Sequence, residues 1–245
     1  MNRTSITGLA CLLAVALTAC AGGGEPPAPS SSPASAPLEA LKEPANSMSV
    51  SPPLSPAPVS AEALAAYRAL LAGEPGALDR PPEGLELHQV TLPPAEELEY
   101  VLLDLDGDGG AELVVQMVAQ PHQFNAVFHY GDGELSCWQY DIMEMSCRDY
   151  PLGDGAMVRQ YDTGTGPNRY SNLYTVFRYL PDGETEECAS LAVHQDTQED
   201  GTEVFTYLVD DAEVDQDTFA AQFEELVGSR LLSLEDWTPA TERPG

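Results

Sequence analysis

Residues 100–115 read Tyr-Val-Leu-Leu-Asp-Leu-Asp-Gly-Asp-Gly-Gly-Ala-Glu-Leu-Val-Val, and this stretch is the strongest structural signal in the chain. Its apolar ends are typical of strands, and its centre is rich in aspartate and glycine, which favour turns. A parallel pair of strands would need a crossover of a dozen or more residues, and this connection is shorter. The stretch therefore predicts two antiparallel strands, 100–105 and 113–118, joined by an acidic loop.

Similar strand-like runs follow, separated by short turn signals. Gly131-Asp132-Gly133 and Pro181-Asp182-Gly183 are typical of hairpin turns. Because the connections are short, consecutive strands should again pair antiparallel. We expect a strand-dominated α+β domain at 61–239, built as an antiparallel meander sheet with an N-terminal and a C-terminal helix. The remaining expected strands are 124–130, 135–140, 156–161, 173–180 and 204–209.

Two amphipathic segments predict the helices at the ends of this domain. Ser60 is placed to cap the first helix, and Gly73 suits its end. Asp215 or Asp217 is placed to cap the second helix, and Gly228 suits its end. Apolar residues recur at helical spacing in both segments. They are Leu64, Tyr67, Leu70 and Leu71 in the first, and Phe219, Phe223, Leu226 and Val227 in the second.

The acidic loop also predicts a metal site. Asp104, Asp106 and Asp108 alternate along it, so a tight turn can direct three carboxylates at one centre. Gly110 can add its backbone carbonyl, and Glu112 adds a further carboxylate. An all-oxygen, anionic cage of this kind suits Ca²⁺, and without a cation the carboxylates would repel one another. The alternative is an aspartate- and glycine-rich turn that holds no ion.

This motif resembles the DxDxDG loops of EF-hands, dockerins and the FG-GAP repeats of integrin-type propellers. An EF-hand loop carries Glu at its twelfth position, which is Val115 here, and has helices rather than strands on both sides. A dockerin has two such loops, and a propeller needs at least four blades. The pattern of helix, strand, LxDLDGDGxxEL loop, hairpins and C-terminal helix is also similar to uncharacterised lipoproteins of anaerobic bacteria. That resemblance implies no activity.

The charge of the chain excludes one class of partner. It has 40 acidic and 10 basic residues, and its formal net charge is -30. Such a chain repels nucleic-acid phosphates and anionic lipid head groups, so we expect no nucleic-acid partner.

The first 20 residues have the order of an export signal. Asn2-Arg3 supplies a positive start, and residues 6–17 form an apolar run that is too short to span a bilayer. The sequence Leu17-Thr18-Ala19-Cys20 then resembles the lipobox of bacterial lipoproteins. The resemblance implies a signal peptide at 1–19, a lipid on Cys20, and a protein anchored on the extracytoplasmic face of the cell membrane. An ordinary secretory signal is the alternative.

Residues 20–60 are dominated by proline, alanine, serine and glycine. Such a segment cannot bury enough apolar surface to offset its ordering entropy, so it predicts a disordered stalk behind Cys20. We also expect a disordered tail at 240–245. Outside the cytoplasm a disulfide between Cys137 and Cys147 is an option, with buried free thiols as the alternative.

Other motifs in the chain are weak as catalytic signals. Asp162-Thr163-Gly164-Thr165 copies an aspartic-protease signature, but that chemistry needs two facing aspartates, and a glycine-rich loop is the simpler interpretation. The four histidines, His88, His122, His129 and His194, have no metal-binding spacing.

These observations favour a non-enzymatic, monomeric lipoprotein whose calcium-stabilised domain binds an unidentified protein or glycan. A hydrolase of cell-wall or dietary polymer is the first alternative, and would require a pocket that joins two carboxyl groups. A solute-binding subunit is the second alternative.

Overall fold

The computed structural model describes residues 57–119, 121, 124–140, 147–166, 168–242 and 244. The expected signal peptide at 1–19, Cys20, nearly all of the expected stalk, and His122 lie outside these residues. In the part of the chain that is described, no helix has both the length and the apolar character that crossing a bilayer requires.

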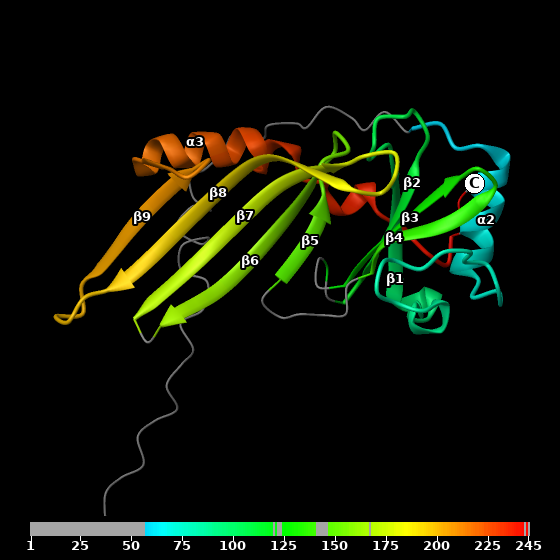
Figure 1. Cartoon of the computed structure of the whole chain (residues 1–245), viewed down its shortest axis with the longest axis horizontal. Coiled ribbons are helices and arrows are strands. Elements are labelled where there is room, and N and C mark those ends of the chain that lie inside the picture. Colours follow the sequence, from blue (N-terminus) through cyan, green and yellow to red (C-terminus); the bar gives the residue numbers. More distant parts are fainter. Residues whose placement is uncertain are drawn as a thin grey trace, which may run out of the picture. The chain divides into compact units, whose positions relative to one another are not determined.

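The strands form two antiparallel sheets (Figure 1). The first sheet has the order β11-β1-β2-β3-β4 and the second has the order β10-β9-β8-β7-β6-β5. The strands of the first sheet are β1 (Leu98–Leu103), β2 (Glu112–Met117), β3 (Asn125–Gly131), β4 (Glu134–Tyr140) and β11 (Thr238–Pro239). Those of the second are β5 (Cys147–Pro151), β6 (Met157–Gly166), β7 (Arg169–Tyr179), β8 (Thr185–Thr197), β9 (Glu203–Val209) and β10 (Ala212–Val214).

The expected fold class is confirmed, because strands dominate, neighbours pair antiparallel, and a helix lies near each end of the domain. The expectation of one continuous meander is wrong. The order of neighbours breaks between β4 and β5, and β5 pairs with β6 alone. Strongly twisted open sheets of about ten strands tend to split into two packed sheets, which gives the physical reason for the break.

Four strands were not anticipated, and β8 is the most informative of them. Its first residues, including Glu186 and Glu187, are exposed and charged, which is typical of a loop. Only Ala189, Leu191 and Val193 are buried, and these alternate residues all face one side. The strand nevertheless pairs along its length with β7 and β9. The other three are β5, β10 and β11.

Both helices begin where the sequence predicts. The first helix, α2 (Ala61–Leu71), is capped by Ser60, whose Oγ accepts the N–H of Ala63 at 3.0 Å. The second, α3 (Gln216–Leu226), is capped by Asp215, which accepts the N–H of Thr218 at 2.7 Å. Helix α3 packs on β8 and β9 (Figure 1).

The first sheet is buried on both faces. One face packs against α2, where Tyr67 and Leu71 meet Leu113, Phe128 and Leu135. The alternate residues face the other way and join side chains of the second sheet, including Met157, Phe177 and Tyr179. The first-sheet members of this second cluster are Val101, Leu103, Leu105, Val114 and Val127.

A buried polar network also joins the two sheets. Asp149 of β5 is 1% exposed and accepts the Nε2–H of Gln139 of β4 at 2.7 Å. Gln139 Oε1 in turn accepts the hydroxyl hydrogen of Tyr179 at 2.6 Å. Arg159 forms a two-nitrogen contact with the Asp149 carboxylate, with Nη2 to Oδ2 at 2.6 Å. The contact between the sheets is therefore both apolar and hydrogen-bonded.

The C-terminal segment packs where a disordered tail at 240–245 was expected. Strand β11 pairs with β1, and Ala240 is 3% exposed with its N–H bonded to the Leu98 carbonyl at 2.9 Å. The Tyr100 hydroxyl donates to the Glu242 carbonyl at 3.1 Å. The short polar sequence hid this packing because one backbone pairing, rather than an apolar pattern, holds it.

The two cysteines considered as a disulfide pair belong to different sheets. Cys137 lies in β4 and is a buried free thiol, so it is not bonded to Cys147, which begins β5. Burial raises the pKa of the Cys137 thiol to about 12. The hairpin that would have joined them does not exist, because β4 pairs with β3 and β5 pairs with β6.

Candidate metal centre

The acidic loop connects β1 to β2 at the centre of the first sheet. Gly107 and Gly109 have φ angles of 77° and 88°, a left-handed conformation that glycine adopts without a steric penalty. These two residues let the chain reverse within a few positions and bring its carboxylates together. The sequence prediction of a tight acidic turn between antiparallel strands is thus confirmed.

The aspartates of the loop bind its own backbone. Asp104 accepts the N–H of Gly107 through Oδ1 at 2.7 Å and that of Gly109 through Oδ2 at 3.1 Å. Asp106 Oδ1 accepts the N–H of Asp108 at 3.0 Å, and Asp108 Oδ1 accepts that of Gly110 at 2.5 Å. These bonds hold the carboxylates within the turn. Whether the Gly110 carbonyl serves as a ligand stays a prediction.

Two groups of side chains here could hold a metal ion. Asp104, Asp106 and Asp108 form one group, and Asp106, Glu112 and His129 form the other. Within each group one ligand atom per residue lies within 4.8 Å of the others. The predicted ligands are therefore split, because Glu112 is grouped with His129 rather than with all three aspartates.

Glu112 is at the first position of β2 and is 1% exposed. Its Oε2 accepts the N–H of Leu105 at 2.7 Å, and its Oε1 lies 3.0 Å from Nδ1 of His129. Glu112 thus ties the start of the loop to β3. This explains why it is drawn away from the aspartates.

His129 was not singled out by its sequence spacing. The register pairs Leu113 with Phe128, so Glu112 and His129 come next to each other at the end of the β2–β3 pair. The ring of His129 stacks on Trp138, with centroids 4.3 Å apart and an angle of 11° between planes. A strand register was the signal that could have found this residue.

Burial and charge act together on the titratable groups. Burial, followed by repulsion from Asp108 and Asp104, raises the pKa of the Asp106 carboxyl. Burial also raises the pKa of Glu112 above its usual value, although the hydrogen bonds from His129 and Leu105 oppose it. Burial lowers the pKa of His129, but the Glu112 carboxylate outweighs it, so the net shift is upward. Each carboxyl shift is one that a bound cation would reverse.

Two further elements hold the loop in place. The Tyr67 hydroxyl of α2 donates to the Ala111 carbonyl at 2.8 Å, and this tyrosine is fully buried. Gly155, in the turn between β5 and β6, packs so closely on the Asp104 carbonyl that a Cβ atom there would clash with it. The loop is therefore supported by the helix, by its own sheet and by the second sheet.

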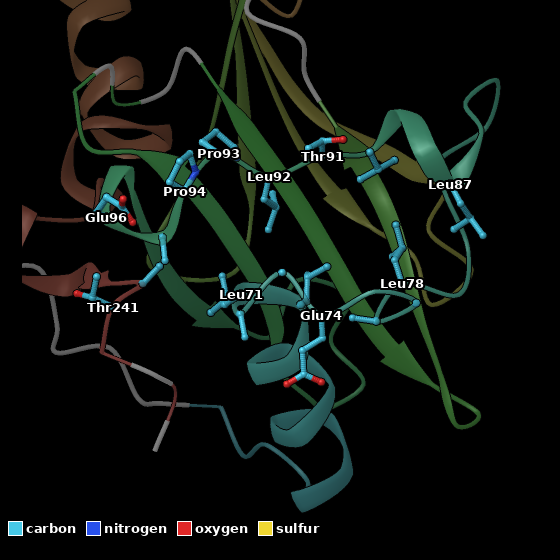
Figure 2. Close-up of a pocket in the computed structure, with 18 of the residues that line it drawn as sticks. Leu71, Glu74, Leu78, Leu87, Thr91, Leu92, Pro93, Pro94, Glu96 and Thr241 are labelled. Atoms are coloured by element: carbon cyan, nitrogen blue, oxygen red, sulfur yellow. The ribbon is translucent and has the colours of Figure 1, made fainter.

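A separate groove lies beside α2 (Figure 2). Its volume is about 1040 Å³, and its lining comes from the end of α2, the segment 87–96 and Ala240-Thr241. Figure 2 shows Leu71, Leu78 and Leu92 in this lining. Most of the other lining residues are apolar or proline, and the carboxylates among them are Glu74 and Glu96. The metal groups are not part of this groove.

The protease-like motif is not in a glycine-rich loop. Asp162 lies within β6 and pairs with Asn172 of β7. Its Oδ2 lies 3.7 Å from Nη2 of Arg148, and it is not among the groove residues. His88 is exposed beside Glu86, and His194 contacts Ser171 at 2.7 Å. In the described part of the chain, none of these residues joins a second carboxylate in a pocket.

Comparisons with family models, with curated proteins and with solved structures found no match to this chain. The site must therefore be interpreted from its own residues.

Proposed function

We propose that this chain is an extracytoplasmic lipoprotein, anchored to the cell membrane through Cys20, whose acidic domain is stabilised by Ca²⁺ and binds a protein or glycan. The observation that carries the proposal is the group Asp104, Asp106 and Asp108, which brings three carboxylates together on a turn between two strands. The lipobox-like sequence before Cys20 supports the location. The role is structural rather than catalytic.

Calcium fits this group because every donor is oxygen. Ca²⁺ takes 6–8 oxygen ligands from carboxylates, carbonyls and water in flexible geometries. The loop joins β1 to β2, and both strands contribute to the two buried clusters of the first sheet. An ion that holds this turn would therefore stabilise the sheet as a whole.

Calcium is expected to raise the melting temperature of the purified protein. At free calcium of about 100 times Kd, binding to the folded state adds about 2.7 kcal/mol of stability. For a domain of this size that corresponds to a rise of about 5–10 °C. Asp108→Asn should remove most of the rise, because it deletes a charge while an amide oxygen can still accept the Gly110 N–H. Thermal unfolding with calcium and with a chelator measures both effects.

A matched control is available in the turn after β7. Asp182 Oδ1 accepts the N–H of Glu184 at 3.1 Å, which is the same local bond that Asp108 makes to Gly110. Asp182→Asn should leave the calcium response unchanged. If wild-type protein melts at one temperature with calcium and with chelator, the calcium proposal is wrong.

Lipid anchoring is expected to depend on Cys20 alone. In a bacterial host, the wild-type chain should incorporate labelled fatty acid and sediment with membranes. Cys20→Ala should incorporate none and leave the membrane fraction, because the acceptor sulfur is gone. Cys188→Ala is the control, since Cys188 is an exposed free thiol of the domain. Labelling of the Cys20→Ala protein would contradict the anchor.

The groove beside α2 is the described concave surface best suited to a ligand. Glu74 and Glu96 make it acidic, and the chain as a whole is strongly acidic. Neutral or cationic ligands are therefore favoured over anionic ones.

A further inference from the structure

Asp106, Glu112 and His129 converge from three segments of the first sheet. Asp106 lies in the loop, Glu112 begins β2, and His129 lies in β3. Their ligand atoms lie within 4.8 Å of one another. The donor set contains an imidazole nitrogen, unlike the all-carboxylate group of Asp104, Asp106 and Asp108.

We propose that Asp106, Glu112 and His129 bind a divalent transition-metal ion such as Zn²⁺, at a site distinct from the calcium group. Imidazole is a ligand of zinc and its transition-metal neighbours, whereas Ca²⁺ binds oxygen. Asp106 belongs to both groups, so its two oxygens can serve the two ions separately. The inference goes beyond the proposed function and does not require calcium in the loop.

The strongest support is an unsatisfied oxygen. Asp106 Oδ2 is buried and has no hydrogen-bond partner among the described residues, while Oδ1 accepts the Asp108 N–H. A buried carboxylate oxygen without a donor is costly, and buried charges are normally paired or bound to a metal. A cation on Oδ2 would supply the missing partner.

The other two ligands are already oriented. Glu112 is almost fully buried, and the Leu105 N–H fixes its Oε2, which leaves Oε1 facing Nδ1 of His129 at 3.0 Å. The stack on Trp138 fixes the plane of the imidazole. Ligands held in this way lose little entropy when an ion binds.

The chemistry of binding balances simply. The proton held between Oε1 and Nδ1 leaves to solvent, and the metal ion takes its place between the same two atoms. Because a proton is released, the affinity should fall as the pH is lowered. Three protein ligands leave a coordination position for water, as in open zinc sites.

The test is a titration of the purified full chain with Zn²⁺, and with Co²⁺ as a visible-absorption probe, in saturating calcium. Calcium occupies the oxygen-only group and the exposed carboxylates. His129→Gln is expected to raise the Kd for both probes at least about 100-fold, since loss of supporting partners alone costs 10–100-fold. Glu112→Gln should do the same, while its amide oxygen can still accept the Leu105 N–H.

Two further variants distinguish this site from adsorption to the acidic surface and from one site shared with calcium. His88→Gln, at an exposed histidine beside Glu86, should leave the Kd for Zn²⁺ unchanged. Asp108→Asn should abolish the calcium response and retain Zn²⁺ binding, because Asp108 belongs to the first group only. Zn²⁺ binding without a calcium response in wild type would overturn the calcium proposal and leave this one standing.

Three results would overturn the inference. The first is wild-type Kd for Zn²⁺ in both His129→Gln and Glu112→Gln. The second is an equal loss in His88→Gln, which would indicate adsorption to an acidic surface. The third is loss of Zn²⁺ binding in Asp108→Asn, which would indicate a single shared site. Circular dichroism of each variant in calcium checks that it is folded.

Discussion

Asp149→Ala is expected to lower the free energy of unfolding by about 3 kcal/mol. The carboxylate is fully buried and binds Gln139 from the first sheet and Arg159 from the second. Removing it leaves the Gln139 amide without this acceptor. The Arg159 side chain is 51% exposed and can turn to water, which keeps the loss at the lower end for a broken buried pair. Urea unfolding followed by circular dichroism measures the change.

An exposed ion pair provides the comparison. Arg80 and Glu134 lie 2.8 Å apart, with side chains 61% and 52% exposed. Glu134→Ala should cost less than about 1 kcal/mol, because solvent screens the pair. If Asp149→Ala proves no more destabilising than Glu134→Ala, the polar network does not hold the two sheets together.

Leu135→Ala is expected to destabilise the domain by about 2–5 kcal/mol. Leu135 is fully buried in β4, in the cluster that packs α2 on the first sheet. The truncation leaves a cavity between the helix and the sheet in addition to the lost transfer free energy. The melting temperature should fall, by about 2–4 °C for each kcal/mol lost.

Leu234→Ala is the matched control, because the same atoms are removed from a side chain that is 80% exposed. Its effect should stay within about 0.5 kcal/mol. Equal melting temperatures for the two variants would show that α2 does not pack on the first sheet as described.

Much of the local structure followed from sequence. Ser60 and Asp215 mark helix starts because their side chains satisfy free backbone N–H groups. The hairpins were predictable because short connections force antiparallel pairing. Strand β8 was not, because its pairing to two neighbours lies in the backbone while its first residues are exposed and charged.

The candidate site divides in the same way. Asp104, Asp106 and Asp108 were found from their spacing, since a single tight loop brings them together. His129 was missed because it lies 17 positions after Glu112 along the chain. Only the pairing of β2 with β3 makes the two side chains neighbours. The predicted cage was therefore correct in its aspartates and incomplete in its nitrogen donor.

The amino-acid sequence alone determined the strand-rich composition, the helix caps, the acidic turn and the charge that excludes nucleic acid, because each depends on residues close together in the chain or on a sum over it. The tertiary structure decided the division into two sheets, the Gln139–Asp149 junction and the partner of Glu112. These depend on strand register and on which faces are buried together. Both properties arise only when distant segments pack, so no local pattern carries them.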